Sequence, residues 1–513
     1  MRELQVNQIK AGAILSYLSM GLSTVISLVY TPIMIQRLGD SEFGVYQTVL
    51  PIISYLNMLT FGLGSAYIRY YSRSKAENDK KNMAKLNGMF LLTYIALGAL
   101  VLGIGFLLAG HGDVIFGKKL TAEEIALGDK LLRIMTVNAA LTFPISVFES
   151  HVAIQERYLF QKILAMGKQV LNPLLMIPLL LLGYRSVTLT VVALGFTVVS
   201  GLVNVYYCLV KLEMPFRFGR YDFRLMREMM GFTVYVFIGI VVNNFNWAID
   251  RLLLGWIHGT DAVTIYVPAA QLNTYFLSIA TIISGVLIPR VNRIVAEKRP
   301  MRELDALFTK TGRLQFIILS CVLWGFVAVG RPFVVLWMGA PEFSADYTIT
   351  LILMFACVWS NCQTLGIEIQ TAMNMHRFRS LVYAAVAVGN TLISIPLCMR
   401  WEGVGSAIGT MIATIVGEVF LMNWYYCKRI GLNIPAFWKH LFHLLPAMLL
   451  PAAAALLIAV FAKIDSYLGC LLWGLVFVAV YAGSMWLFGL NRFERGLVSG
   501  VARKLFGKPE RRT

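Results

Sequence analysis

Charged side chains are scarce in this sequence. Asp, Glu, Lys and Arg together make up 14% of its 513 residues, whereas 58% of the residues are hydrophobic. A soluble chain of this length needs far more polar surface than such a composition provides. Charge is missing altogether from stretches such as 14–35 and 89–110, and a helix needs about 20 apolar residues to cross a bilayer. The composition therefore excludes a soluble protein and predicts an all-α polytopic membrane protein.

Sequence patterns for metal sites and disulfides are also missing. None of the seven cysteines belongs to a Cys-x-x-Cys pair, and the six histidines include no His-x-x-x-His pair. These are the spacings that most often indicate zinc or redox chemistry. We therefore expect no metal, no cofactor and no catalytic residue.

The apolar runs predict about fourteen transmembrane helices. The run after the polar segment 1–10 is too long for the hydrophobic core of a signal peptide, so we expect it to form the first of them. The expected spans are 11–36, 43–68, 86–110, 131–152, 160–183, 187–210, 231–257, 263–289, 314–337, 347–369, 380–399, 404–427, 441–462 and 468–490.

Basic residues are distributed unequally between the two sets of loops. The set that includes both termini holds 34 of the 45 Lys and Arg residues, the other set holds nine, and Lys168 and Arg251 lie inside spans. Loops rich in Lys and Arg stay on the cytoplasmic side. We therefore expect both termini in the cytoplasm. The net charge of +18 then reflects topology and contact with membrane lipids, not a nucleic-acid partner.

An internal repeat with a period of about 220 residues is visible in four short matches. They occur in order and at nearly the same separation, pairing 39–46 with 259–266, 64–69 with 285–290, 157–158 with 377–378, and 204–208 with 423–427. Each repeat unit holds six spans, an even number, so both copies have the same orientation in the membrane. We expect six-helix bundles at 1–215 and 216–432, an added helix pair at 433–490 and a basic cytoplasmic tail at 491–513. Two such pseudo-symmetric bundles are typical of transporters that work by alternating access.

Three motifs carry a resemblance to a known family. They are Ile35-Gln-Arg-Leu-Gly39 followed by Phe43-Gly-Val-Tyr46, Asn246-Trp-Ala-Ile-Asp-Arg251 followed by Gly255, and Trp401-Glu-Gly-Val-Gly405. The chain resembles polysaccharide-export flippases of the multidrug/oligosaccharidyl-lipid/polysaccharide superfamily, which also contains multidrug transporters and lipid II flippases. The resemblance covers residues 8 to 430 and implies outward transport of an undecaprenyl-pyrophosphate-linked oligosaccharide across a bacterial inner membrane. Lipid II flippases carry several arginines in the first helix, and here 14–36 has none.

Ionisable residues inside spans are costly and usually functional. Arg251 and Lys168 are our candidates for the pyrophosphate, with Arg69 and Arg290 as docking cations at the cytoplasmic ends of their helices. Candidates for coupling or for a polar cavity are Asp250, Glu149, Glu368, Asn243 and Asn246. Retention of topology, snorkelling and helix packing are alternative roles for these residues. Glu418 lies deep in a span without an obvious partner.

Other functions remain open at this stage. A lipid II flippase and a cation-coupled drug antiporter share the predicted architecture, and a membrane glycosyltransferase or polymerase is the enzymatic alternative. The acidic motif Asp40-x-Glu42 superficially resembles a metal site. We expect Asp40 or Ser41 to be the N-cap of the following helix, with Glu42 in its first turn. Expected partners are the lipid-linked oligosaccharide and membrane lipids, with a polysaccharide polymerase and glycosyltransferases as candidate protein partners.

Overall fold

The computed structural model is built from helices. It describes residues 2–60, 62–116, 119–219, 221–229, 237, 249–285, 287–373, 375–496 and 499, with side chains in the first helix from Leu18 onward. These residues contain helices but no strand. The chain packs into two compact units, Met1–Val267 with Thr391–Ser406 and Pro268–Asn390 with Ala407–Thr513. The predicted bundle boundaries at 215 and 432 stay a prediction of the repeat.

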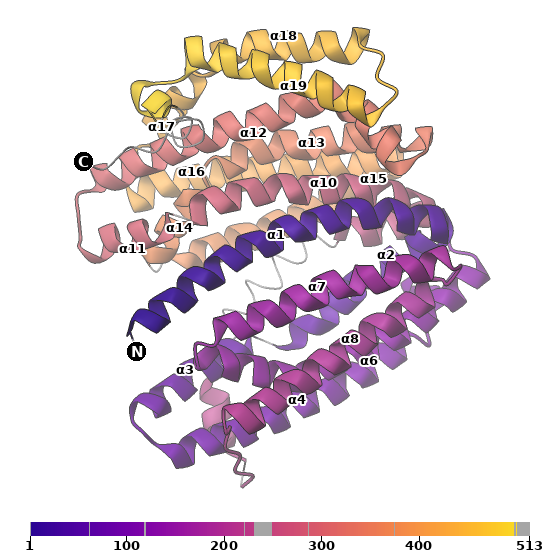
Figure 1. Cartoon of the computed structure of the whole chain (residues 1–513), viewed down its shortest axis with the longest axis vertical. Helices are drawn as coiled ribbons and strands as arrows, with labels where there is room; N and C mark the ends of the chain where they lie inside the picture. The colour runs from indigo at the N-terminus through magenta and orange to yellow at the C-terminus, as the bar shows by residue number, and fades with distance from the viewer. Residues whose placement is uncertain are drawn as a thin grey trace, which may run out of the picture. The chain divides into compact units, whose positions relative to one another are not determined.

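The first unit is organised around one long central helix. Its helices are α1 (Arg2–Leu38), α2 (Asp40–Asn57), α3 (Leu63–Ala76), α4 (Lys80–Leu108), α5 (Gly112–Ile115), α6 (Ala122–Ile154), α7 (Tyr158–Leu181) and α8 (Ser186–Tyr206). α6 packs against α2, α4 and α8, and α1 packs along α7 (Figure 1). Aromatic side chains from α3, α4 and α6 fill the interior, with Tyr67, Phe90 and Phe143 at 1% exposure or less.

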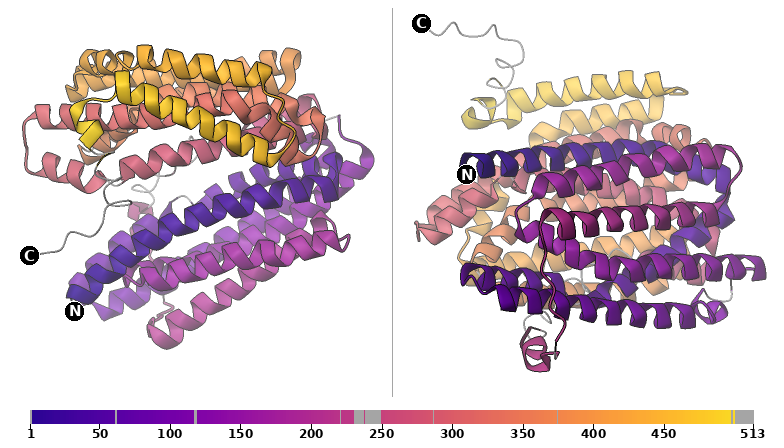
Figure 2. Two further views of the ribbon diagram at one scale, coloured as in Figure 1. Left: turned by 45° about the horizontal axis from the view of Figure 1, so that its top comes forward. Right: turned by 60° about the horizontal axis from the view of Figure 1, so that its bottom comes forward.

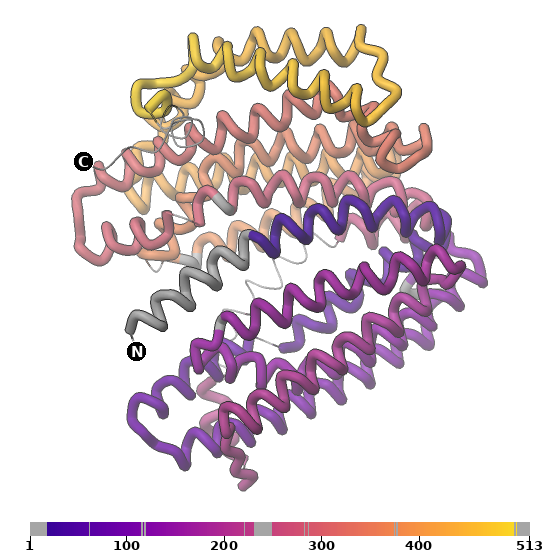
Figure 3. The backbone as a smooth tube through the Cα atoms, in the orientation of Figure 1, coloured from indigo at the N-terminus to yellow at the C-terminus, as the bar shows by residue number. Residues whose placement is uncertain are grey.

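The second unit packs its C-terminal hairpin onto α12. Its helices are α11 (Ile288–Ala296), α12 (Met301–Met338), α13 (Ser344–Asn361), α14 (Thr364–Ala372), α16 (Met422–Tyr425), α17 (Ile434–Phe442), α18 (Leu445–Phe461) and α19 (Tyr467–Ser484). α18 and α19 pack against each other and both pack against α12 (Figure 2). The backbone of this unit can be followed from α12 to α19 in Figure 3. Two helices, α10 (Thr260–Gly285) and α15 (His376–Thr414), contribute residues to both units.

Local sequence signals explain where several helices begin. Thr121 and Glu124 form a capping box at the start of α6, each accepting a hydrogen bond from the other's backbone N–H. Asn433 and Ser466 cap α17 and α19 by accepting from a backbone N–H three residues ahead. Such caps satisfy donors that have no partner within the helix.

The predicted N-cap of α2 is wrong. The cap position is Gly39, with φ 79°, and no side chain caps the helix. Glu42 does lie in the first turn, as expected, but its buried carboxylate serves another helix. It accepts hydrogen bonds from the Ser186 backbone N–H and hydroxyl at the start of α8, at 2.8 and 2.5 Å. The acidic motif therefore joins two helix starts.

The described residues contain ten helices long and apolar enough to span a membrane, or up to twelve if each of two bent pairs is one span. The chain is thus a polytopic membrane protein. One candidate, Phe378–Ile430, has 53 residues and breaks its helical geometry at Trp401 and Glu402. It covers two of the fourteen predicted spans. The predicted span 231–257 lies mostly outside the described residues.

Left-handed backbone residues support the predicted repeat. Within the described chain, four pairs of residues with positive φ are separated by 218 to 220 positions: Gly39 and Gly259, Asn78 and Lys298, Gly183 and Glu402, and Glu213 and Gly431. The π-helical segments Tyr207–Lys211 and Tyr426–Ile430 share the same spacing. Positive φ is rare outside glycine. Pairs of such residues at a separation of about 220 positions therefore agree with the sequence matches found at the same separation.

Candidate functional site

A polar pocket lies within the first unit, among α6, α7 and α8. Its volume is about 350 Å³, and it is lined by Glu149, Gln161, Lys162, Leu164, Ala165, Lys168, Ser200 and Asn204. The α7 residues 161, 164, 165 and 168 follow helical spacing and share one face, as do 200 and 204 on α8. The pocket therefore joins two predicted site residues, Lys168 and Glu149, that stand on the consecutive helices α7 and α6.

Lys168 is held loosely in this pocket. Its Nζ donates one hydrogen bond, 3.2 Å long, to Thr197 Oγ1 on α8. Glu149 interacts with it electrostatically, but no ion pair joins the two side chains in the described structure. An ammonium group carries three donors, so Lys168 keeps donor capacity for a ligand in the pocket. Lys162, nearly two turns away on α7, adds a second cation to the lining.

Asn204 gives the pocket a hydrogen-bond acceptor. The residue is 2% exposed, and its Nδ2 donates to the Ser200 carbonyl at 3.1 Å. Its Oδ1 is buried without a partner within the described structure. Leaving such a group unsatisfied costs about 1–3 kcal/mol. A hydrogen-bond donor that reached this atom would remove that cost, so the pocket lining holds an unused acceptor as well as cations.

Asp250 occupies a second polar site in the same unit, and here the carboxylate is well satisfied. It is 4% exposed. Tyr266 donates a hydrogen bond to its Oδ2 at 2.8 Å, and Ser406 donates to Oδ1 at 2.7 Å. Ser406 follows the break in α15, where a Cβ on Gly405 would collide with the Leu397 carbonyl. The Trp401–Gly405 motif thus allows a tight bend that brings Ser406 to Asp250.

Arg251 contacts α2. Its Nη1 donates to Gln47 Oε1 at 3.4 Å, and its Nε is buried without a hydrogen-bond partner among the described residues. Arg251 does not line the pocket that contains Lys168. The two predicted phosphate ligands therefore lie in different polar environments of the first unit.

The other predicted site residues are dispersed. Arg69 is exposed on α3 and Arg290 is exposed on α11, whereas Glu368 is half-buried on α14. Asn243 and Asn246 lie outside the described residues. The described part of the chain contains no group of three or more His, Cys, Asp or Glu side chains arranged to hold a metal.

A buried ion pair in the second unit was not predicted from the sequence. Arg313 on α12 is 7% exposed and Glu494 is 2% exposed. Nε of Arg313 donates to Glu494 Oε1 at 2.7 Å, and Nη2 donates to Oε2 at 3.0 Å. Arg313 stands one residue before the predicted span 314–337. The sequence pattern alone therefore indicates a solvent-exposed position at the end of a helix. Only the folding of the C-terminal segment onto α12 buries it.

Glu418 has partners, contrary to expectation. Its carboxyl group interacts electrostatically with Arg379 and with the Ser360 hydroxyl. It lies in the π-helical segment Ile415–Leu421. Ser360 is nearly 60 residues away in the sequence. A pattern within one helix therefore could not predict this interaction.

The family follows from comparison with known proteins. The model of the family described as polysaccharide biosynthesis protein matches residues 9–295, which is more than half of the chain. The chain belongs to this family. One relative, the uncharacterized membrane protein EpsK of Bacillus subtilis (strain 168), is 24% identical over 507 residues, covering 95% of this chain and 96% of its own length.

Solved structures of a lipid II flippase and of a multidrug transporter share the fold. A lipid II flippase MurJ in an inward closed conformation matches with a TM-score of 0.75 at 14% identity, covering 95% of this chain and 99% of its own. An inward-facing MATE family multidrug transporter of the MOP superfamily matches with a TM-score of 0.62 at 17% identity, covering 81% of this chain and 96% of its own. At these identities the likeness concerns the fold. It agrees with the predicted family of polytopic transporters and flippases.

Proposed function

We propose that this protein is a flippase that moves an undecaprenyl-pyrophosphate-linked oligosaccharide from the cytoplasmic to the outer leaflet by alternating access. One observation carries the proposal beyond family membership. Lys168, Lys162, Asn204 and Glu149 form a polar pocket on helices whose remaining surface is largely apolar. The substrate of such a flippase has the matching chemistry, anionic phosphates next to many hydroxyl groups.

The physical demand on such a protein is severe. An unpaired hydroxyl in an apolar medium costs roughly 2–7 kcal/mol, so a sugar headgroup needs polar partners throughout its path. Phosphates need cations, and Lys168 has donors available because it makes one long hydrogen bond. The buried acceptor of Asn204 suits a sugar hydroxyl. The prenyl chain can remain in the surrounding lipid.

The remaining predicted residues enter this proposal with specific roles. Arg251 provides a further cation, and Arg69 and Arg290, both exposed, dock the pyrophosphate at the cytoplasmic surface. Glu149 and Glu368 are candidates for coupling. Asp250 is assigned a positioning role, because both of its carboxylate oxygens already accept hydrogen bonds. Asn243 and Asn246 stay predicted cavity residues.

The proposed orientation places both termini in the cytoplasm of a bacterial inner membrane. The unequal distribution of Lys and Arg between loops supports it. In that orientation each negative charge moved outward gains about 2.3 kcal/mol per 100 mV of membrane potential. The potential can therefore assist export of a pyrophosphate-linked substrate.

The test is flipping of a labelled undecaprenyl-pyrophosphate oligosaccharide in proteoliposomes, with lipid II as a second substrate. The purified full-length chain should move the oligosaccharide at least as fast as lipid II. Lys168→Ala should slow the transport, whereas Lys130→Ala, which removes an exposed cation from α6, should leave it unchanged. If the protein transported lipid II and not the oligosaccharide, its substrate would be lipid II and the proposed function would be wrong. Equal rates for wild type and Lys168→Ala would remove the pocket from the mechanism.

A further inference from the structure

A second polar hollow lies in the second unit, at the N-terminal part of α12. It encloses about 420 Å³ and is lined by Arg302, Asp305, Ala306, Thr309, Lys310, Arg313, Asn433, Ala436, His440 and Asn491. These residues come from three segments that are distant in sequence: α12, α17 with its N-cap, and the segment after α19. The distribution of Lys and Arg predicts the cytoplasmic side for all three segments. The structure brings them together around one hollow.

The charges around this hollow do not cancel. Arg313 in its wall is neutralised by Glu494, and Asp305 Oδ1 accepts a hydrogen bond from the Asn433 backbone N–H at 2.9 Å. Arg302 and Lys310 belong to no ion pair in the described part of the chain. The Lys310 ammonium lies 4.8 Å from the centre of the Phe493 ring. Two exposed cations therefore face a hollow with one lining carboxylate, which leaves an excess of positive charge.

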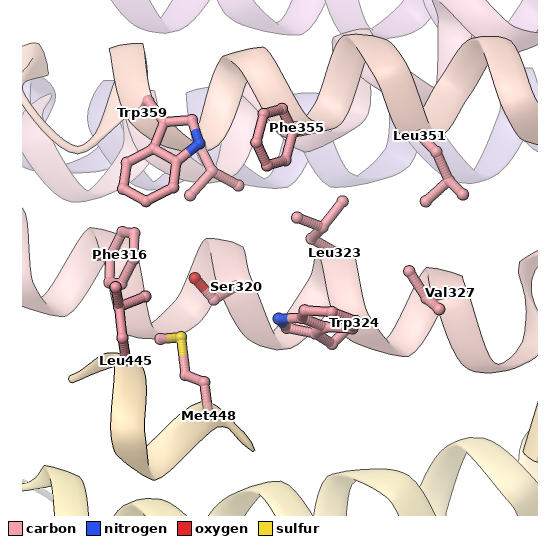
Figure 4. Close-up of a pocket in the computed structure, with 11 residues that line it drawn as sticks. Phe316, Ser320, Leu323, Trp324, Val327, Leu351, Phe355, Trp359, Leu445 and Met448 are labelled. Atoms are coloured by element: carbon pink, nitrogen blue, oxygen red, sulfur yellow. The ribbon is translucent and has the colours of Figure 1, made fainter. Parts of the chain in front are cut away.

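A separate, apolar hollow lies farther along the same helix. Beyond Arg313, α12 becomes apolar, and Phe316, Ser320, Leu323, Trp324 and Val327 line a second hollow of about 300 Å³. At 100° per residue these positions share the face of α12 that carries 302, 306, 309 and 313. Figure 4 shows the apolar hollow between α12, the α13 side chains Leu351, Phe355 and Trp359, and Leu445 and Met448 of α18.

This order of surfaces matches an amphiphile. A cationic hollow lies at the polar end of a membrane-spanning helix, where lipid phosphates are found, and an apolar hollow follows at hydrocarbon depth. Basic pockets between transmembrane helices on the cytoplasmic side bind anionic lipid headgroups. A soluble phosphate would need only the first hollow.

We propose that the hollow formed by Arg302, Lys310 and their neighbours binds the headgroup phosphate of an anionic membrane phospholipid, such as phosphatidylglycerol or cardiolipin, with an acyl chain along the apolar face of α12. The bound lipid anchors α17 and the C-terminal segment to α12. This site is separate from the transported substrate and does not depend on the proposed flippase activity.

Binding of phosphatidylglycerol, phosphatidylcholine and inorganic phosphate to the delipidated full-length protein tests the proposal. Native mass spectrometry and the lipid-induced rise in melting temperature are the two readouts. We expect phosphatidylglycerol to bind and stabilise the protein, and the double variant Arg302→Ala/Lys310→Ala to weaken that binding by roughly thirtyfold, since each cation near a lipid surface contributes about a factor of five.

The matched control is Arg293→Ala/Lys298→Ala, which removes two exposed cations from the preceding segment and should retain the wild-type affinity. The melting temperature of each variant without lipid verifies that it is folded. Equal loss of binding in both double variants would reduce the effect to net charge and overturn the proposed site. Equal binding of phosphatidylcholine, or inorganic phosphate binding as tightly as the lipid, would also overturn it. None of these outcomes depends on transport.

Discussion

Arg313 and Lys168 are two cations placed in apolar helices, and their surroundings differ in one decisive respect. Arg313 donates to both oxygens of Glu494 and also to the carbonyls of His440 and Gly489. Lys168 donates one hydrogen bond of 3.2 Å to Thr197 and opens onto a pocket. A buried charge is tolerable only when it is paired and hydrogen-bonded. The satisfied cation therefore stabilises the fold, whereas the loosely bonded Lys168 is our proposed ligand contact.

The sharpest way to break this comparison is Arg313→Ala. It leaves Glu494, which is 2% exposed, as a buried charge without its partner. Removing one partner of a buried ion pair costs about 3–5 kcal/mol. We expect a large fall in the unfolding midpoint of the purified protein in detergent. The double variant Arg313→Met/Glu494→Leu should recover most of it, because it removes both charges. If the unfolding midpoint of Arg313→Ala equalled that of the wild type, the stabilising role assigned to this ion pair would be wrong.

Asp250→Ala should have the next largest effect. The hydroxyls of Tyr266 and Ser406 would lose their acceptor in a buried site, at about 1–3 kcal/mol for each unsatisfied group. Ser406→Ala removes a single donor and should cost less. Stability is measured by thermal unfolding alongside transport of the lipid-linked oligosaccharide. If Asp250→Ala remained as stable as the wild type yet abolished transport, Asp250 would belong with Lys168.

Lys168→Ala should behave in the opposite way. A half-buried cation with one long hydrogen bond contributes little to stability, so we expect a change within about 0.5 kcal/mol. Transport should fall by roughly tenfold or more, as expected when a charge-assisted hydrogen bond worth about 1.5–3 kcal/mol is lost. Lys168→Arg, which keeps the charge, should retain part of the activity. A strongly destabilised Lys168→Ala would place this residue in the same class as Arg313.

The smallest effect is expected at the surface pair Lys85 and Asp222, whose Nζ and Oδ2 atoms are 2.7 Å apart. Hydrogen bonds from Lys85 and from the Leu225 backbone N–H lower the pKa of Asp222. The pair therefore stabilises the protein above the unfolded pKa of Asp, about 3.9, and this contribution is lost as the pH falls through the lower folded value. Asp222→Asn should slightly flatten the acid side of the stability profile. High salt should remove the difference, because exposed pairs are screened.

Much of the fold was predictable because the signal for it is local. The first span was expected at 11–36, and α1 ends at Leu38. The repeat was found from residues such as Gly39 and Gly259, and the structure places both in the left-handed region. Glycine is favoured there because it has no Cβ. Such features depend on the chemistry of one residue or on the composition of one run.

Contacts between distant helices were not predictable in the same way. Glu42 was correctly placed in a first helical turn, but its bonds to Ser186 cross more than 140 residues. Arg313 stands just before a predicted span, and it is buried by Glu494, 181 residues away in the sequence. Lys168 and Glu149 were each singled out for being charged within a span. Their meeting with Asn204 in one pocket depends on how α6, α7 and α8 pack.

The sequence by itself determined that this protein is a membrane protein. It also determined the positions of most membrane-crossing helices and the family to which the chain belongs. Each of these follows from apolar run length or from short motifs, because the bilayer imposes the same demand on every segment. Only the tertiary structure decided which buried charges are neutralised and which remain open to a ligand. That outcome depends on hydrogen-bond partners from other helices, whose distance and direction no single segment contains.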